Sequence, residues 1–117
     1  MFEIKKENDT AIITINSAIE KSTIEEFEEF RIQCNALQSD GIRNIILNME
    51  KVENPPSIFL GTIIVLQKKF KNSEGNVAII NPTERIRKIF EITQMDRIIG
   101  IYATEEDALN SLHAKIQ

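Results

Sequence analysis

Short apolar runs alternate along this chain with longer segments whose apolar residues recur every three or four positions. The apolar–polar alternation from Phe2 to Lys6 and the β-branched residues from Ala11 to Ile15 indicate two strands. The turn signal Asn8-Asp9 between them predicts a hairpin. Three further apolar runs predict buried strands, at Asn44 to Met49, Val77 to Ile80 and Ile99 to Tyr102.

Four segments, three between these runs and one after the last of them, have helical spacing and a residue suited to begin a helix. Thr23 and Glu26 form a capping-box pattern, and Gly41 is suited to end the same helix. The apolar stripe of this helix consists of Phe27, Phe30, Cys34 and Leu37. The other helices are expected from Ser57 to about Asn72, after Thr83 and after Thr104.

The resulting order of elements is β-β-α-β-α-β-α-β-α. Strands that alternate with helices favour parallel crossovers, and the opening hairpin adds an antiparallel edge. We therefore expect an α/β fold with a mixed, mainly parallel sheet of about five strands and about four helices. The 117 residues fit one domain, 1–117, because no linker or repeat divides them.

Composition narrows the class of partner and the compartment. The formal net charge is −4, which argues against nucleic acid, since a basic face is expected for that partner. The longest apolar run, Ile58 to Leu66, is interrupted by Gly61 and is shorter than a membrane span. The N-terminal residues show no signal-peptide pattern and the chain has one cysteine, so we expect a cytoplasmic protein without membrane insertion.

Residue types that carry chemistry are sparse. The single histidine, His113, has no metal-ligand pattern around it, and Cys34 lies on the apolar stripe of a helix. None of the four glycines belongs to a phosphate-binding loop, and Ser57 lies in no nucleophile motif. We therefore expect no catalytic residue, no metal and no cofactor, and a binding module rather than an enzyme.

Four segments that span most of the chain carry a resemblance to a known family. They are Ile15 to Thr23 (INSAIEKST), Ile45 to Val52 (IILNMEKV), Ser57 to Gly61 (SIFLG) and Asn81 to Leu109. In this order and spacing they resemble the STAS domain family, in particular the small bacterial anti-sigma factor antagonists. Glu20 and Asn48 fall where the family has aspartates, and SIFLG falls on the family's Asp-Ser-Ser/Ala-Gly-Leu-Gly motif.

The resemblance implies regulation through protein binding. Anti-sigma factor antagonists of this family bind a kinase-like anti-sigma factor and so release a sigma factor. The kinase phosphorylates a serine at the start of the second helix, which ends the binding, and Ser57 aligns with that serine. The expected partner-binding residues are Glu20, Thr23, Asn54, Pro56, Ser57, Ile58 and Phe59.

The motif around Ser57 also departs from the family. Pro56 replaces the aspartate before the serine, and Ile58 and Phe59 stand where the family has small residues. Because proline has no backbone N–H, we expect Pro55 and Pro56 to remove donors that the first helical turn would offer a phosphate.

The orientation of Phe59 bears on its role. If the second helix rests on the sheet through Leu60, Ile63 and Ile64, Phe59 points at least partly outward, as a partner contact. The alternative is that Phe59 packs beneath the segment from Asn16 to Lys21.

Two other functions stay open at this point. The chain could be an adaptor or scaffold subunit of a signalling assembly or a transporter, with the same fold and no phosphorylation switch. It could also bind a small ligand in an apolar groove beside the second helix. A homodimer is compatible with any of the three.

Overall fold

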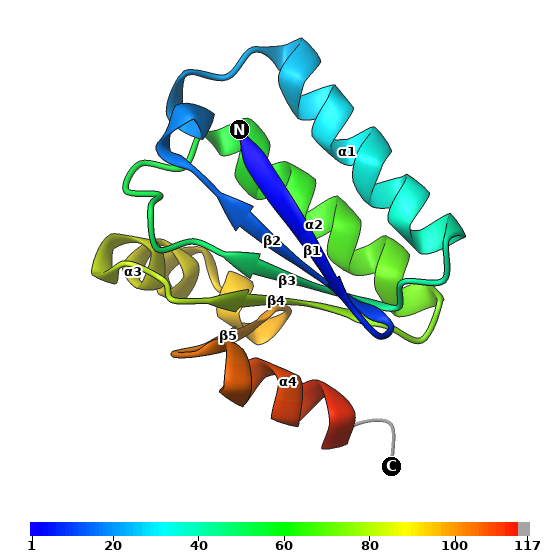
Figure 1. Cartoon of the computed structure of the whole chain (residues 1–117). Coiled ribbons are helices and arrows are strands. Elements are labelled where there is room, and N and C mark those ends of the chain that lie inside the picture. Colours follow the sequence, from blue (N-terminus) through cyan, green and yellow to red (C-terminus); the bar gives the residue numbers. More distant parts are fainter. Residues whose placement is uncertain (115–117) are drawn as a thin grey trace.

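The computed structural model describes residues 1–114 and shows one mixed sheet with helices on both faces (Figure 1). The strands are β1 (Phe2–Glu7), β2 (Thr10–Ile15), β3 (Asn44–Asn48), β4 (Asn76–Ile80) and β5 (Gly100–Tyr102). The helices are α1 (Ile24–Ser39), α2 (Ser57–Asn72), α3 (Glu84–Thr93) and α4 (Glu105–Ala114), with short 3-10 helices η1 (Ser17–Lys21) and η2 (Met95–Arg97). The predicted order of strands and helices is confirmed.

The strands lie in the sheet in the order in which they occur along the chain, from β1 to β5. β1 pairs antiparallel with β2 through the predicted hairpin, and every later neighbour is parallel. Each parallel pair is joined through a helix, as parallel crossovers require. The expected mixed and mainly parallel α/β sheet of five strands and four helices is therefore confirmed.

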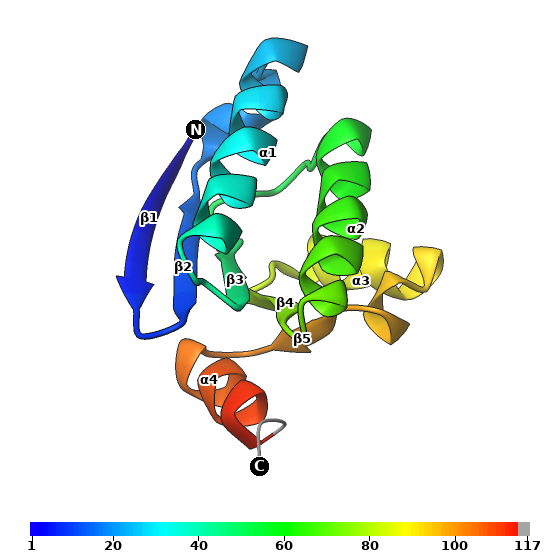
Figure 2. The same cartoon turned by 90° about the vertical axis from the view of Figure 1, so that its right-hand side faces the viewer.

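The sheet separates two apolar layers of unequal size. The larger layer packs alternate strand residues such as Ile13, Ile45 and Leu47 against α1, α2 and α3. The smaller layer packs Ile46 and its neighbours against α4, which covers the opposite face (Figure 2). Most strand residues of β2, β3 and β4 are buried on both faces, which explains their unbroken apolar runs.

Helix ends follow the sequence signals closely. The amide of Glu26 donates to the Thr23 hydroxyl at 3.2 Å, and the Thr23 amide donates to the Glu26 carboxylate at 3.0 Å. This reciprocal capping box fixes the start of α1. Gly41, just past the end of α1, has a φ of +93°, a left-handed conformation that favours glycine.

The orientation of α2 differs from the expectation for Phe59. The Phe59 side chain is 0% exposed and lies between α1 and α2, where its ring is 6.2 Å from Phe27 and 5.9 Å from Phe30. The expectation that Phe59 points outward was therefore wrong. The buried stripe of α2 is centred on Phe59, Ile63, Leu66 and Phe70, while Leu60 and Ile64 are half-buried at its border.

A buried glutamine ties α2 to the sheet. The Gln67 side chain is 2% exposed; its Oε1 accepts from the Val77 amide at 2.8 Å and its Nε2 donates to the Ile98 carbonyl at 3.1 Å. Both side-chain polar groups are thus paired with backbone, which makes the burial of an amide tolerable. The link fixes α2 against the start of β4 and the segment that leads to β5.

Replacing Phe59 by alanine should destabilise the fold strongly, because it removes a ring from the contact between α1 and α2. We expect Phe59→Ala to lower the free energy of unfolding by about 3–5 kcal/mol, measured by urea denaturation. The neighbouring variant Ile58→Ala is the control and should change it by less than about 0.5 kcal/mol, since Ile58 is exposed. Equal effects at the two positions would contradict this packing.

Replacing Gln67 by methionine keeps the length of the side chain but leaves the Val77 amide without its partner. We expect Gln67→Met to lower the free energy of unfolding by about 2 kcal/mol. Gln33→Met, at an exposed position of α1, should have little effect on the same urea curve. A neutral or stabilising Gln67→Met would show that the two hydrogen bonds do not hold α2 in place.

Candidate functional site

Ser57 is the first residue of α2 and is exposed. Pro56 is the N-cap, with φ −63° and ψ 148°, and its carbonyl accepts from the amides of Phe59 at 3.0 Å and Leu60 at 3.2 Å. The ring of proline fixes the φ angle of this residue, and no side chain forms a capping hydrogen bond at this helix start. The sequence prediction that α2 runs from Ser57 to Asn72 is confirmed.

The prolines remove fewer hydrogen-bond donors than the sequence suggested. Pro55 lies before the helix, and only Pro56 occupies a position whose N–H would belong to the first turn. Among the described residues, no hydrogen bond uses the amides of Ser57 and Ile58. The expectation that both prolines take donors from the first turn was therefore wrong for Pro55. Two amides at the positive end of the helix stay open to a group on Ser57.

Glu20 and Asn54 come together although they are far apart in the sequence. The Asn54 side-chain amide donates to a Glu20 carboxylate oxygen at 3.3 Å. Glu20 belongs to η1, which is anchored by the fully buried side chain of Ile19, and Asn54 belongs to the corner before α2. This contact joins the two predicted binding segments into one surface beside Ser57.

The remaining predicted site residues divide into exposed and structural groups. Ile58 is 43% exposed at the start of α2, and Val65 is exposed two turns further along the same helix. Thr23 is exposed, but its hydroxyl is engaged in the capping box of α1. Phe59 lies in the core beneath them. Ile58, and not Phe59, is therefore the apolar side chain that this corner presents to solvent.

Sequence reasoning missed Ile24, which is 72% exposed at the first position of α1. A bulky apolar residue beside the acidic residues Glu25 and Glu26 was the available signal. The helix-start signals Thr23, Glu25 and Glu26 do not indicate which way the Ile24 side chain points. Isolated exposed apolar residues are common, so exposure alone does not make Ile24 a binding residue. We add it to the candidate surface only because it lies in the first turn of α1, directly after Thr23.

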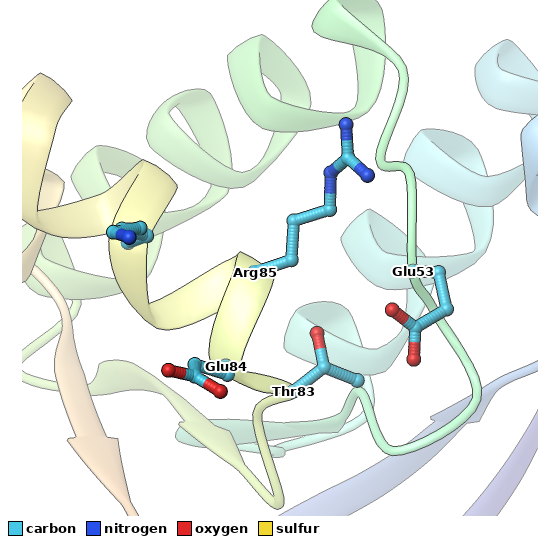
Figure 3. A pocket seen from close by; sticks show the side chains of 5 residues that line it. Glu53, Thr83, Glu84 and Arg85 are labelled. Atoms are coloured by element: carbon cyan, nitrogen blue, oxygen red, sulfur yellow. The ribbon is translucent and has the colours of Figure 1, made fainter.

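A shallow pocket of about 590 Å³ lies between the corner and α3 (Figure 3). Its lining residues are Glu53, Thr83, Glu84, Arg85 and Lys88. Figure 3 shows Arg85 and Glu53 on either side of the opening. The hydroxyl of Thr83 donates to the Val52 carbonyl at 3.3 Å and so fixes the start of α3 against the corner. Two acids and two bases line the pocket, so its charge selects no single kind of ligand.

Two observations bear on catalysis and metal binding: the state of the Cys34 thiol and the placement of possible metal ligands. Burial raises the pKa of the Cys34 thiol to about 12, which keeps it protonated at neutral pH. In the part of the chain that the structure describes, no three His, Cys, Asp or Glu side chains are placed to hold a metal ion. The side chain of His113 lies outside that part.

Within residues 1–114, no helix is both long enough and apolar enough to cross a bilayer.

Comparison with known proteins identifies the family. The family model of the STAS domain matches residues 1–108. A Thermotoga maritima protein proposed to be an anti-sigma factor antagonist is 27% identical over 98% of this chain and 100% of its own length. The anti-sigma-B factor antagonist of Staphylococcus aureus is 25% identical over 76% of this chain and 80% of its own.

The fold is shared with a solved structure of the same class. The crystal structure of a proposed anti-sigma factor antagonist from Thermotoga maritima superposes with a TM-score of 0.81, at 26% identity. The match covers 96% of this chain and 94% of that one. Anti-sigma factor antagonists are non-enzymatic STAS proteins, in agreement with the class expected from the sequence. The chain therefore belongs to the STAS domain family and is similar to its anti-sigma factor antagonists.

Proposed function

We propose that this chain acts in the cytoplasm by binding a kinase-like anti-sigma factor, and that phosphorylation of Ser57 ends the binding. The similarity to anti-sigma factor antagonists supports the class of partner. The observation that carries the proposal is the position of Ser57. It is exposed at the start of α2, next to a surface in which Glu20 contacts Asn54.

The binding surface consists of three parts: the segment 16–23, the corner 54–61 and the exposed face of α2. Ile58 supplies exposed apolar area at its centre, and the carboxylate of Glu20 supplies a charge at its edge. A buried apolar anchor surrounded by polar groups is the usual composition of an energetically important interface. Phe59 contributes indirectly, because its burial holds the first turn of α2 in place.

A phosphate on Ser57 would change this surface by charge and by bulk. It adds about −1.5 to −2 charges at neutral pH. In the free chain, the open amides of Ser57 and Ile58 and the positive end of α2 stabilise such a group. In a complex, the same group would have to lose water beside an apolar partner surface, which weakens binding.

A second function rests on the residues that flank Ser57. Pro56 and Ile58 stand where the family has an acidic and a small residue, and Ile58 presents 43% of its surface beside the serine. The bulk of Ile58 would hinder a kinase that recognises small residues beside the serine. The same fold would then serve as an adaptor or scaffold subunit in a signalling assembly or transporter, without a phosphorylation switch.

The partner class is tested by capture from cells of the source organism. The tagged chain should recover a protein with a kinase-like sequence of the anti-sigma factor class, identified by mass spectrometry. Recovery of transporter or scaffold proteins instead would favour the second function. Repeated recovery of neither class would argue against binding to an anti-sigma factor.

The switch is tested with the purified chain and the captured partner. We expect Ser57→Asp to weaken binding at least about tenfold in calorimetry, or about 1.4 kcal/mol, because it places a charge in the interface. Ser57→Ala should bind as the unmodified chain does. Asn110→Asp adds one charge at an exposed position of α4 and is the matched control, expected to have no effect. A complex that is indifferent to Ser57→Asp would contradict the switch and favour the scaffold.

A substitution of Ile58 distinguishes an effect on partner binding from an effect on folding. Since its side chain is exposed, Ile58→Ala should weaken partner binding by about 1–2 kcal/mol while the urea midpoint stays unchanged. Val65→Ala removes exposed apolar area further along α2 and should have a smaller effect. Unchanged affinity of Ile58→Ala would place the interface elsewhere on the molecule.

A further inference from the structure

β1 forms one edge of the sheet, and none of the described residues pairs with its outer side. Figure 2 shows β1 as the outermost element, with no helix beyond it. Most of its side chains are exposed, including Glu3, Lys5, Lys6 and Glu7. An open edge strand of six residues offers a row of backbone donors and acceptors to another strand.

The hydrogen bonds of the hairpin show which backbone groups face outward. The amide of Asn16 donates to the Met1 carbonyl at 3.0 Å, so Met1 directs its carbonyl toward β2. In an antiparallel ladder the direction of the backbone groups alternates from residue to residue. The N–H and C=O groups of Glu3, Lys5 and Glu7 therefore also point toward β2. The N–H and C=O groups of Phe2, Ile4 and Lys6 therefore point toward the open edge.

The side chains of β1 alternate between the two faces of the sheet. Phe2 lies on the α1 side, where its ring is 4.9 Å from that of Phe30. Ile4 and Lys6 lie on the same side and line a shallow groove of about 490 Å³ against Gln33, Ala36, Leu37 and Asp40 of α1. Lys5 lies on the α4 side, where its ammonium is 3.8 Å from the Glu105 carboxylate. Glu3 shares that side.

We propose that β1 pairs antiparallel with β1 of a second copy of this chain, about a two-fold axis at Ile4. The two sheets then form one continuous sheet across the dimer. Ile4 faces Ile4 of the second copy, and their outward N–H and C=O groups exchange hydrogen bonds. Glu3 faces Lys5 of the second copy, and the symmetry repeats this opposite-charge pair.

The charges of β1 favour this register over the registers in which the two-fold axis is shifted by one residue. In an antiparallel strand pair, side chains directly opposite each other lie on the same face of the sheet. A two-fold axis between two copies of β1 must therefore lie beside one residue, which then faces its own copy. An axis at Lys5 would oppose the two copies of Lys5 and set Glu3 against Glu7. An axis at Glu3 would oppose the two copies of Glu3. Like charges directly opposite each other destabilise a strand pair, so the axis at Ile4 is favoured.

Lysine on an edge strand often prevents such pairing. Here the register gives Lys5 a carboxylate partner from the second copy. On the other face, Ile4 and Phe2 of the second copy would cover the open side of the groove, next to Ala36 and Leu37. β1 and α2 lie on different sides of the molecule, so the dimer leaves Ser57 free to bind a partner (Figure 2).

Sedimentation velocity of the full chain over a range of concentrations tests the proposal. The unmodified chain should show a concentration-dependent dimer. Glu3→Lys and Lys5→Glu each create two like-charge pairs and should weaken the dimer at least about tenfold. The double variant Glu3→Lys/Lys5→Glu exchanges the charges and should restore it. Glu91→Lys changes the net charge as Glu3→Lys does, but lies at an exposed position of α3, outside β1, and should leave the dimer unchanged.

Single cysteines test the register without altering Glu3 or Lys5. The native Cys34 is buried, so it does not compete for a thiol-specific reagent. A short bifunctional reagent should link two copies of Ile4→Cys, which face each other. It should not link Lys6→Cys, because the two positions lie about 13 Å apart along the strands. Circular dichroism confirms that each variant is folded.

Three results would overturn the proposal. One is a chain that sediments as a monomer at every concentration up to the millimolar range. Another is a dimer that survives both single charge variants or fails to return in the double variant. The third is cross-linking of Lys6→Cys as efficient as that of Ile4→Cys.

Discussion

The contact of Phe59 with Phe27 and Phe30 determines what the start of α2 presents to solvent. The three rings lie between α1 and α2, and Phe59 is fully buried there. An α-helix turns by about 100° per residue, so directing Phe59 inward sends Ser57 and Ile58 away from the core. Phe59, which the sequence suggested as a surface contact, is therefore a buried residue that holds the binding surface in position. The candidate site depends on this packing more than on any polar interaction within it.

Around that fixed helix start, the surface is assembled from segments distant in sequence. Ile19 anchors η1 in the core, and Glu20 reaches Asn54 at the corner. Gln67 holds the middle of α2 to β4 and to the segment before β5. The exposed residues of the corner are therefore carried by a rigid support, as expected for a site that recognises a folded partner. The β1 edge and α2 lie on different sides of the molecule, so the proposed strand pairing leaves the start of α2 open to a partner (Figure 2).

The sequence predicted the features that local interactions control. Apolar runs located the strands, and Thr23, Gly41 and Thr83 located helix ends because caps act within a few residues. The rotation of α2 was missed, since apolar residues from Ile58 to Leu66 surround most of the helix and fit several inner faces. Aromatic contacts with α1, about thirty residues earlier, decide between them. Gln67 and the pair Glu20–Asn54 depend on the same tertiary arrangement, so no local pattern reveals them.

Hydrogen–deuterium exchange of the chain, alone and with its captured partner, tests the central claim most directly. The amides of Ser57 and Ile58 have no hydrogen-bond partner among the described residues and should exchange rapidly in the free chain. In the complex, we expect exchange to slow in segments 16–23 and 54–61 and to stay unchanged in α4. Slowing confined to α4 or β5, with the start of α2 unaffected, would contradict the account.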